Sequence, residues 1–538
     1  MAVTARFQKS LPALATACIF VAGLTGTGVA PATAGGEGGE AKDCLGDVAG
    51  VDLQSATILD LQRALESGRL TSRRLVAAYL DRIAAYDPKL NSIRELNPNA
   101  LALAGRLDRE RGAGDVRGPL HGIPLLLKDN VNTTDMPTTA GSIALKGSVP
   151  AHEAFITSQL ERAGAIILGK ANLSEFAGWV SLSMPPGYSS LGGQVVNPYN
   201  GASPSGSSSG SGVAGTMAFA AGTVGTETSG SILSPSDANS AVGIKTTVGL
   251  VSRAGILPLA PSFDTPGPIT RNVTDAAVML SAMAGVDPND PKTEESKGQT
   301  PKNNDYTRFL KTDALKEVRL GYSEEDRDDL ADDARAIFDR ALEDLEKQGA
   351  TLVPTDLLYW SEWVGLTEIA AVPNEFKASL NQYLADETSD KLRVRTLTDI
   401  IEYNRAHPEK VKYGQNLLEA SDLTLGNMNE PTAIANRTAA IQGARAAIDA
   451  TLIANDLDAI VVVPGNAYAN VSASAGYPTV IVPAGYTGDG RRPLGLSFLA
   501  SAYDEPQLIS YAYDYEQATH RRVPATEVNV ELVAIACG

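Results

Sequence analysis

The sequence predicts an α/β protein with one large domain, whose central β-sheet is covered by helices on both faces. Helical and strand-like runs alternate along the chain, which is the pattern of this class. Two strand-like runs, "AIVVVPG" (459–465) and "PTVIVPAG" (478–485), are continuously apolar, as is typical of strands covered on both sides. The 538 residues are 43% hydrophobic and 20% charged, so a large core can be buried.

The first 34 residues have the pattern of a secretory signal peptide. Arg6 and Lys9 give a positive start, a mostly apolar run follows, and small residues precede a cleavage point after Ala34. The alternative is a membrane anchor, which the glycines in the apolar run and the cleavage pattern disfavour. We therefore expect a secreted, extracellular protein with a signal peptide over 1–34 and a flexible lead over 35–50.

The domain itself is expected to span residues 51–538. Near its start, Thr57 and Asp60 form a capping pair for a helix that ends at about residue 67. A second helix follows Thr71, and we expect Pro88 to end it.

Further along, "GAIILGKAN" (164–172) predicts a short buried strand. Apolar residues at helical spacing predict a helix over 332–348, stopped by Gly349. Residues 353–455 contain helical runs and no strand runs, so we expect a helix-rich insertion over one edge of the sheet.

Charge and cysteine content restrict the partners. The formal net charge is -18, and loss of two cations with the signal peptide leaves -20, which argues against nucleic acid or an anionic membrane. Cys44 and Cys537 then remain, either as one disulfide between the two ends or as free thiols. The four histidines are scattered and no Cys-x-x-Cys pair occurs, so we expect no metal site. Nothing demands more than a monomer.

Two segments dense in serine and glycine are candidates for chemistry: "SPSGSSSGSG" (203–212) and "GTETSGSILSP" (225–235). Such segments are either tight turns or loops whose glycines let the backbone approach a substrate. The first also fits the G-x-S-x-G nucleophile elbow of α/β-hydrolases, with Ser208 at its centre. However, "NPYNGASPS" before it reads as a loop, whereas an elbow follows a strand. No Gly-Lys-Ser/Thr ends the segment, which argues against a phosphate loop.

Together with "GPLHGIPLLLKDN" (118–130), these segments resemble the amidase signature family of serine hydrolases. The resemblance covers nearly all of the mature chain, including "GAIILGKANLSEF", "VGIKTTVGLVSRAGILPL" and "DTPGPITRNVTDAA", and is nearest to the peptide amidases. It implies the amidase signature fold, with a mixed central sheet, and amide hydrolysis that requires no metal or organic cofactor.

The resemblance also implies roles for individual residues. Ser231 matches the nucleophile, Ser207 the bridging serine and Lys128 the base. The Gly206–Ser207 peptide bond is expected to be cis. The backbone N–H groups that match the oxyanion hole belong to Thr228, Ser229, Gly230 and Ser231. The chain departs from many members at Leu233, where they have arginine, so a substrate anion is less expected there.

Lys128 follows three leucines, and this setting has a physical meaning. A solvated lysine has a pKa of about 10.4 and cannot act as a base at neutral pH, but burial can lower that pKa by about 3–5 units. A neutral Lys128 could take a proton from Ser207, which takes one from Ser231. We interpret Asp129, Asn130 and Asp264 as groups that orient loops.

Several functions remain open from the sequence. The leading one is a secreted amidase that acts on carboxamides, including the C-terminal amide of peptides. A broad aryl or aliphatic acylamidase with esterase activity is a second, and a catalytically silent binding protein is a third. The amidotransferase subunit that acts on misacylated tRNA shares the signature, but export and the acidic charge argue against it. We expect the pocket walls to come from 180–195 and from the helix-rich insertion.

Overall fold

The computed structural model describes residues 43–357, 362–388, 392–462, 467–488 and 490–537. The predicted signal peptide and residues 35–42 of the predicted lead lie outside these ranges. Among the described residues, no helix combines the length and the apolar character needed to cross a membrane.

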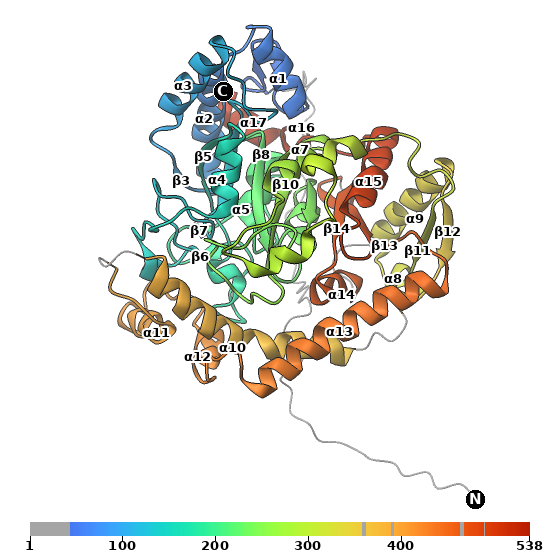
Figure 1. Cartoon of the computed structure of the whole chain (residues 1–538). Helices are drawn as coiled ribbons and strands as arrows, with labels where there is room; N and C mark the ends of the chain where they lie inside the picture. Colours follow the sequence, from blue (N-terminus) through green and yellow to red (C-terminus); the bar gives the residue numbers. More distant parts are fainter. Residues whose placement is uncertain (1–42, 358–361, 389–391, 463–466, 489, 538) are drawn as a thin grey trace, which may run out of the picture. The chain divides into compact units, whose positions relative to one another are not determined.

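An 11-stranded sheet forms the centre of the domain (Figure 1). From one edge to the other its strands are β12 (Thr351–Pro354), β11 (Arg319–Tyr322), β13 (Ala459–Val462), β15 (Arg492–Leu499), β14 (Thr479–Thr487), β9 (Val242–Lys245), β10 (Thr265–Thr270), β8 (Gly222–Glu227), β4 (Pro124–Lys128), β5 (Ile166–Ala171) and β3 (Ile93–Leu96). β4 runs parallel to β5 and β8, and β11 runs parallel to β12 and β13, whereas the other neighbours are antiparallel. The sheet is therefore mixed, as expected.

Helices cover both faces of the sheet. A Cβ added to Gly222 of β8 would lie 2.4 Å from Met279 on α7 (Val273–Met283). One added to Gly225, which faces the other way, would meet Ser208 and Ile232, next to α5 (Ser209–Thr216) and α6 (Leu233–Ala238). The predicted two-faced α/β fold is confirmed.

The remaining elements lie around this sheet. The other helices are α1 (Ile58–Glu66), α2 (Ser72–Leu90), α3 (Ala100–Gly112), α4 (Phe155–Arg162), α8 (Glu324–Asp328), α9 (Asp332–Lys347), α10 (Glu362–Asp386), α11 (Leu397–Ala406), α12 (Asn416–Asp422), α13 (Pro431–Ala454), α14 (Ala467–Ala475), α15 (Glu505–Thr519), α16 (Ala525–Val528) and α17 (Val530–Cys537). Two small sheets pair β1 (Asp47–Val48) with β2 (Val51–Asp52) and β6 (Tyr188–Ser189) with β7 (Gly193–Gln194).

Local sequence patterns predicted the ends of several helices correctly. α1 begins at the Thr57–Asp60 capping box, and α9 ends one residue before the predicted limit. α2 corrects the prediction at Pro88, which lies inside the helix. The helix continues to Leu90 because proline removes only one N–H donor near a helix end, and Asn91, in the left-handed conformation, then stops it.

The predicted flexible lead is too long, because residues 43–50 belong to the fold. Asp43 accepts hydrogen bonds from Arg82, which is fully buried, and from Tyr86, each at 2.8 Å. Cys44 forms a disulfide with Cys537, so the pairing that the sequence left open is present in the structure.

The helix-rich segment lies elsewhere than we expected. Figure 1 shows α10, α12 and α13 running across one end of the strands instead of covering an edge. The reason is that α10 and α11 build a core of their own, in which Phe376, Leu380 and Ile400 pack against Phe176 and Phe263 from the sheet's loops. The segment therefore forms a wall facing the strand ends.

Candidate active site

Adjacent strands bring the candidate base to the centre of the sheet. β4 ends at Lys128 and pairs in parallel with β8, so their carboxyl ends lie side by side. Lys128 is 0% exposed, and the three leucines before it are also fully buried. The short apolar run thus places an amine inside the protein at the end of a strand.

Four oxygen atoms surround the Lys128 amine. Its Nζ lies 2.9 Å from Ser207 Oγ, 2.9 Å from Ser208 Oγ, 2.9 Å from Thr226 Oγ1 and 3.1 Å from the Thr226 carbonyl oxygen. These partners are hydroxyls and a carbonyl, and none is a carboxylate. The amine is therefore buried without a direct counter-ion.

This environment changes the acid–base behaviour of the lysine. Burial lowers the pKa of Lys128 to about 7, and the negative charges of Asp264 and Glu227 oppose that shift. Because a charged ammonium is costly to bury, the neutral form is stabilised near neutral pH. Such an amine can accept a proton from a neighbouring hydroxyl.

The serine-rich loop presents Ser207 to the lysine. The Gly206–Ser207 peptide bond is cis, as the resemblance implied. Ser208 is held differently, because its hydroxyl donates to the Thr226 carbonyl at 3.0 Å and accepts the Thr226 N–H at 3.2 Å. Residues before the loop form no strand, which excludes the nucleophile-elbow geometry for Ser208.

Ser231 lies on the turn between β8 and α6, next to this loop. Its carbonyl oxygen accepts the Ser208 N–H at 3.2 Å, and the residue is buried. Glu227 fixes the far side of the turn, since one carboxylate oxygen accepts the N–H groups of Ile232 at 2.6 Å and Leu233 at 3.0 Å. The serine-rich loop and the turn, whose Ser207 and Ser231 lie 24 positions apart in the sequence, are thereby joined.

The backbone of the turn remains open to a ligand. The N–H groups of Ser229, Gly230 and Ser231 donate to no acceptor within the described part of the chain. Gly230 has a φ of 77°, a left-handed conformation that glycine adopts without strain. Clustered free N–H groups of this kind can stabilise an oxyanion.

A buried carboxyl on α10 supports the turn from the other side. Glu368 accepts hydrogen bonds from the side chains of Ser474, on α14, and Ser229. Burial raises the pKa of Glu368 to about 7. The helix-rich segment therefore contacts the turn directly.

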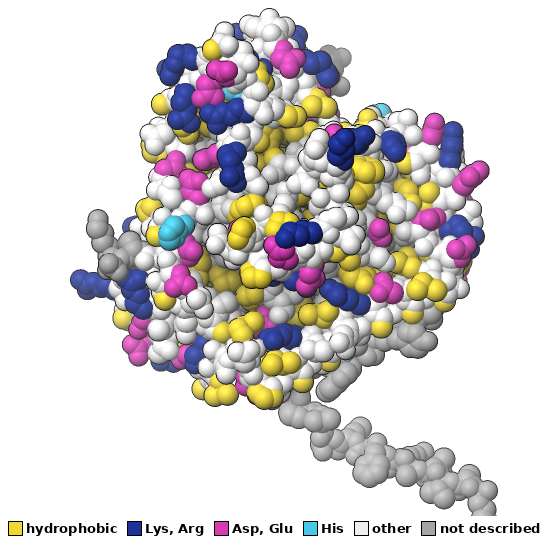
Figure 2. Space-filling view, in the orientation of Figure 1, with side chains coloured by type: hydrophobic (Ala, Val, Ile, Leu, Met, Phe, Trp, Pro, Cys, Tyr) yellow, Lys and Arg dark blue, Asp and Glu magenta, His cyan; other side chains and the backbone are white. Residues whose placement is uncertain are grey.

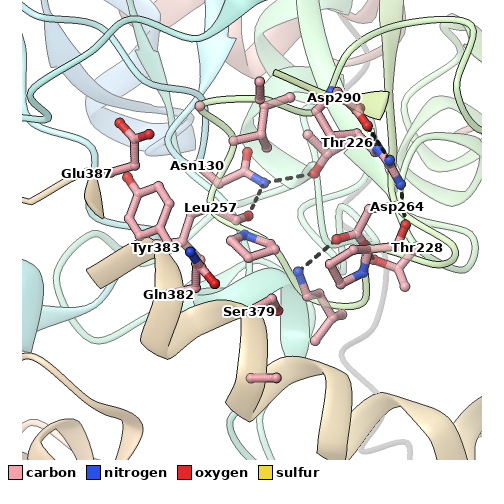
Figure 3. Close-up of a pocket in the computed structure, with 18 of the residues that line it drawn as sticks. Asn130, Thr226, Thr228, Leu257, Asp264, Asp290, Ser379, Gln382, Tyr383 and Glu387 are labelled. Atoms are coloured by element: carbon pink, nitrogen blue, oxygen red, sulfur yellow. Dashed lines mark hydrogen bonds and ion pairs between the residues drawn. The ribbon is translucent and has the colours of Figure 1, made fainter. Parts of the chain in front are cut away.

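A cavity of about 600 Å³ opens beside these residues. It reaches the candidate residues through Thr226, which contacts Lys128, and Thr228, three residues before Ser231. Figure 3 shows Asn130 and Thr226 on one wall, with Ser379, Gln382 and Tyr383 of α10 on another.

The origin of the cavity walls was predicted only in part. The helix-rich segment contributes residues 378–387 and 426–428, as expected. Residues 180–195 do not line this cavity, and residues 253–259 take that place. The reason is that Leu257 N–H bonds to the Asn130 carbonyl at 2.8 Å, which brings this loop beside the end of β4.

The polar residues beside Lys128 orient loops as we expected. Asp129 accepts hydrogen bonds from the Thr139 hydroxyl and N–H, and Asn130 donates to Thr226 Oγ1 at 3.0 Å. Asp264 accepts the Thr228 hydroxyl at 2.5 Å together with two backbone N–H groups.

Sequence reasoning did not single out Thr226, Glu227 or Glu368. For Glu227 a signal was present, because an acidic residue at the end of a buried strand of small residues requires partners. Thr226 and Glu368 gave no such signal, since their roles depend on strand pairing and on distant helices.

Comparison with known proteins gives a consistent result. The family model described as Amidase matches residues 74–509. A probable amidase of Arabidopsis thaliana is 42% identical over 484 residues, covering 88% of this chain and 91% of the relative. A putative amidase of Schizosaccharomyces pombe is 37% identical, covering 86% and 85%. The crystal structure of peptide amidase from Stenotrophomonas maltophilia is 42% identical, with a TM-score of 0.83 over 87% of this chain and 98% of that one.

Proposed function

The chain belongs to the amidase family and is a hydrolase acting on amides, and we propose that it cleaves them through an acyl-enzyme formed on Ser231. The observation that carries this proposal is the contact between the buried Lys128 amine and the Ser207 hydroxyl. This contact supplies a base with a pKa of about 7, and Ser208, the residue after Ser207, donates its N–H to the Ser231 carbonyl.

The proposed reaction moves one proton along a relay. Neutral Lys128 takes the Ser207 proton while Ser207 takes the Ser231 proton, and Ser231 Oγ attacks the amide carbon. The free N–H groups of the turn hold the negative oxygen of the tetrahedral intermediate. The proton returns along the same path to the leaving nitrogen, the C–N bond breaks, and water then hydrolyses the ester through the same groups.

We further propose that the amides are carried by short peptides, at their C-terminus. The similarity to peptide amidase in sequence and fold supports this substrate class. The cavity volume of about 600 Å³ lies in the range of sites that enclose ligands of a few residues. An acylamidase that accepts aryl or aliphatic amides is the second candidate, because residues 256–259 give the cavity an apolar stretch.

The proposal includes export and independence from partners. The pattern of residues 1–34 and the bridge between Cys44 and Cys537 support an extracellular protein, since disulfides persist in oxidising compartments. The net charge of -18 argues against nucleic acid and anionic membrane, and Figure 2 shows basic side chains interspersed with acidic ones over one face. The mechanism requires neither a metal ion nor an organic cofactor, and one copy of the chain holds all its groups.

One substrate panel tests the proposed function. An amidated tripeptide, its free-acid form and its p-nitroanilide are incubated with the wild-type protein and with the Ser231→Ala variant, and ammonia or nitroaniline is measured. We expect ammonia from the amidated peptide with the wild type only. Release from none of the substrates between pH 6 and 9 would favour a silent binding protein, and anilide cleavage without ammonia release would favour the acylamidase.

A further inference from the structure

The charges around the cavity are strongly uneven. Within the described part of the chain its lining includes one cation, Arg253. The same lining includes four carboxylates: Asp264, Asp290, Asp386 and Glu387. Figure 3 shows Asp264 and Glu387 on opposite sides of the cavity, so acidic groups lie both near the reacting end and at the far end of α10.

The single lining cation is already neutralised. Arg253 Nε and Nη2 donate to the two oxygens of Asp290 at 2.8 and 2.5 Å, and Nη1 donates to a backbone carbonyl. The cations behind the wall are also held by acids, because Lys377 lies 3.2 Å from Asp422 and Arg437 lies 3.8 Å from Glu375. Each of these three cations contacts an acid, and Arg253 also acts through space on Asp264.

The other three carboxylates have no Lys or Arg partner among the described residues. Asp264 accepts only hydroxyl and backbone donors. Asp386 accepts the Gln382 amide at 2.8 Å. Glu387 accepts the Asn132 amide at 3.3 Å and lies 3.5 Å from His152, whose side chain is 74% exposed.

Asn130 lines the same cavity and carries a buried acceptor without a partner in the described ranges. Asn130 is only 3% exposed, and its amide N–H₂ donates to Thr226 and to the Leu257 carbonyl. Its Oδ1 has no donor among the residues that the structure describes. A buried acceptor without a donor is unfavourable, so this side of the cavity carries an unsatisfied polar atom just behind its lining.

We propose that this cavity selects amides that carry a protonated amine or a basic side chain away from the scissile bond, and that it disfavours substrates with a carboxylate. The inference rests on the proposed function and specifies its substrate class. Asp264 is partly buried and Asp386 is exposed, and three carboxylates without a contacting Lys or Arg in the described part of the chain attract a cation and repel an anion by the same law. The acid product of peptide-amide hydrolysis is repelled too, which favours its release.

Three blocked dipeptide amides test the proposal: acetyl-Lys-Phe-NH₂, acetyl-Gln-Phe-NH₂ and acetyl-Glu-Phe-NH₂. We expect kcat/KM for the lysine substrate to exceed that for glutamine about fivefold, with the glutamate substrate a further fivefold lower. Raising NaCl to 0.5 M should reduce both ratios, because salt screens charges near the cavity mouth.

Variants locate the effect. The double variant Asp386→Asn and Glu387→Gln keeps side-chain shape and removes two charges from the cavity lining, so the lysine-to-glutamate ratio of kcat/KM should fall about fivefold. The matched control, Glu343→Gln with Asp456→Asn, removes two exposed charges that do not line the cavity and should leave the ratio unchanged.

The outcomes separate the two proposals. If all three peptides are hydrolysed at equal rates, or if the control variant shifts the ratio as much as the cavity variant, the charge selection is overturned and the amidase function stands. If none is hydrolysed by the wild type, and Ser231→Ala behaves identically, the proposed function itself fails.

Discussion

At the scale of single residues, the decisive feature is which hydroxyl can give a proton to Lys128. Of the two serines beside the amine, Ser208 donates its hydroxyl hydrogen to the Thr226 carbonyl. The Ser207 hydroxyl makes no competing bond within the described part of the chain, apart from its contact with the lysine. Of these two serines, Ser207 is therefore the one whose hydroxyl is free to pass a proton to the amine.

The pH dependence follows from the same lysine. Its pKa of about 7 means that the amine is protonated, and unable to act as a base, at lower pH. We expect kcat/KM for a neutral amide to rise about tenfold per pH unit up to about pH 7 and then to level off. A rate profile from pH 5 to 9 measures this, and a profile that is flat through this range would contradict the role of Lys128.

Two neighbouring serines provide a matched comparison. Ser207→Ala should lower kcat by at least about 100-fold, because the relay loses its middle hydroxyl. Ser208→Ala removes a hydrogen bond to the backbone of β8. It should lower the stability of the protein and reduce kcat by about tenfold or less. Steady-state kinetics with circular dichroism as a folding control measures both, and the opposite order would point to Ser208 as the reactive serine.

At the scale of elements, the turn from β8 to α6 depends on one carboxylate. Glu227 holds two successive N–H groups of the turn, and its other oxygen has no donor among the described residues. The turn is therefore positioned by a side chain from the strand that precedes it.

Variants at Glu227 test this positioning role. Glu227→Gln keeps the accepting oxygen and should retain kcat within about tenfold, whereas Glu227→Ala leaves two N–H groups unpaired and should lower kcat about 100-fold. The measurement is kcat against KM for both variants. An equal loss of kcat in the Gln and Ala variants would show that the negative charge of Glu227 matters and its hydrogen bonds do not.

The wall formed by α10 is attached through a buried hydroxyl. Tyr383 donates to Asn132 Oδ1 at 2.6 Å, which joins α10 to the loop after β4. Tyr383→Phe removes the donor and should lower the free energy of unfolding by about 1–2 kcal/mol. We expect a lower melting temperature and a KM raised about threefold with kcat nearly unchanged. An unaltered KM would mean that this contact does not shape the cavity.

Local signals explain how much of these elements could be predicted. The Thr57–Asp60 capping box and the apolar run before Lys128 involve neighbouring residues, so the sequence alone revealed them. The contact from Glu368 to Ser229 joins residues 139 positions apart, and no local pattern encodes it. The wall at 253–259 was missed for the same reason, because a backbone hydrogen bond to Asn130 places it.

At the scale of the whole molecule, strand order decides which segments meet. β4 and β8 are neighbours in the sheet, although 93 residues lie between the end of β4 at Lys128 and the start of β8 at Gly222. This intervening stretch includes helices and the serine-rich loop. The fold class and the three candidate residues could be predicted through alternation and family motifs. The order of 11 strands could not, because edge and centre positions follow from packing of the complete sheet.

The disulfide joins the two ends of the described chain, and removing it tests how much this link stabilises the fold. Cys44 and Cys537 are separated by 493 positions, so the bridge restricts the unfolded chain strongly. The double variant Cys44→Ser and Cys537→Ser should be less stable by about 2–4 kcal/mol, and activity at 25 °C should be unchanged. Thermal unfolding measures this. A wild type whose melting temperature is insensitive to reductant would contradict it.

The proposed reacting groups and the facing wall of the cavity lie in separate stretches of the chain. Lys128, Ser207 and Ser231 precede the wall residues at 378–387 by well over a hundred positions. A mutant library confined to Ala378, Ser379 and Gln382 would alter which amides enter, and every member would keep the proposed reacting residues unchanged. The protein is thus a natural starting template for directed evolution of new amide-cleaving catalysts.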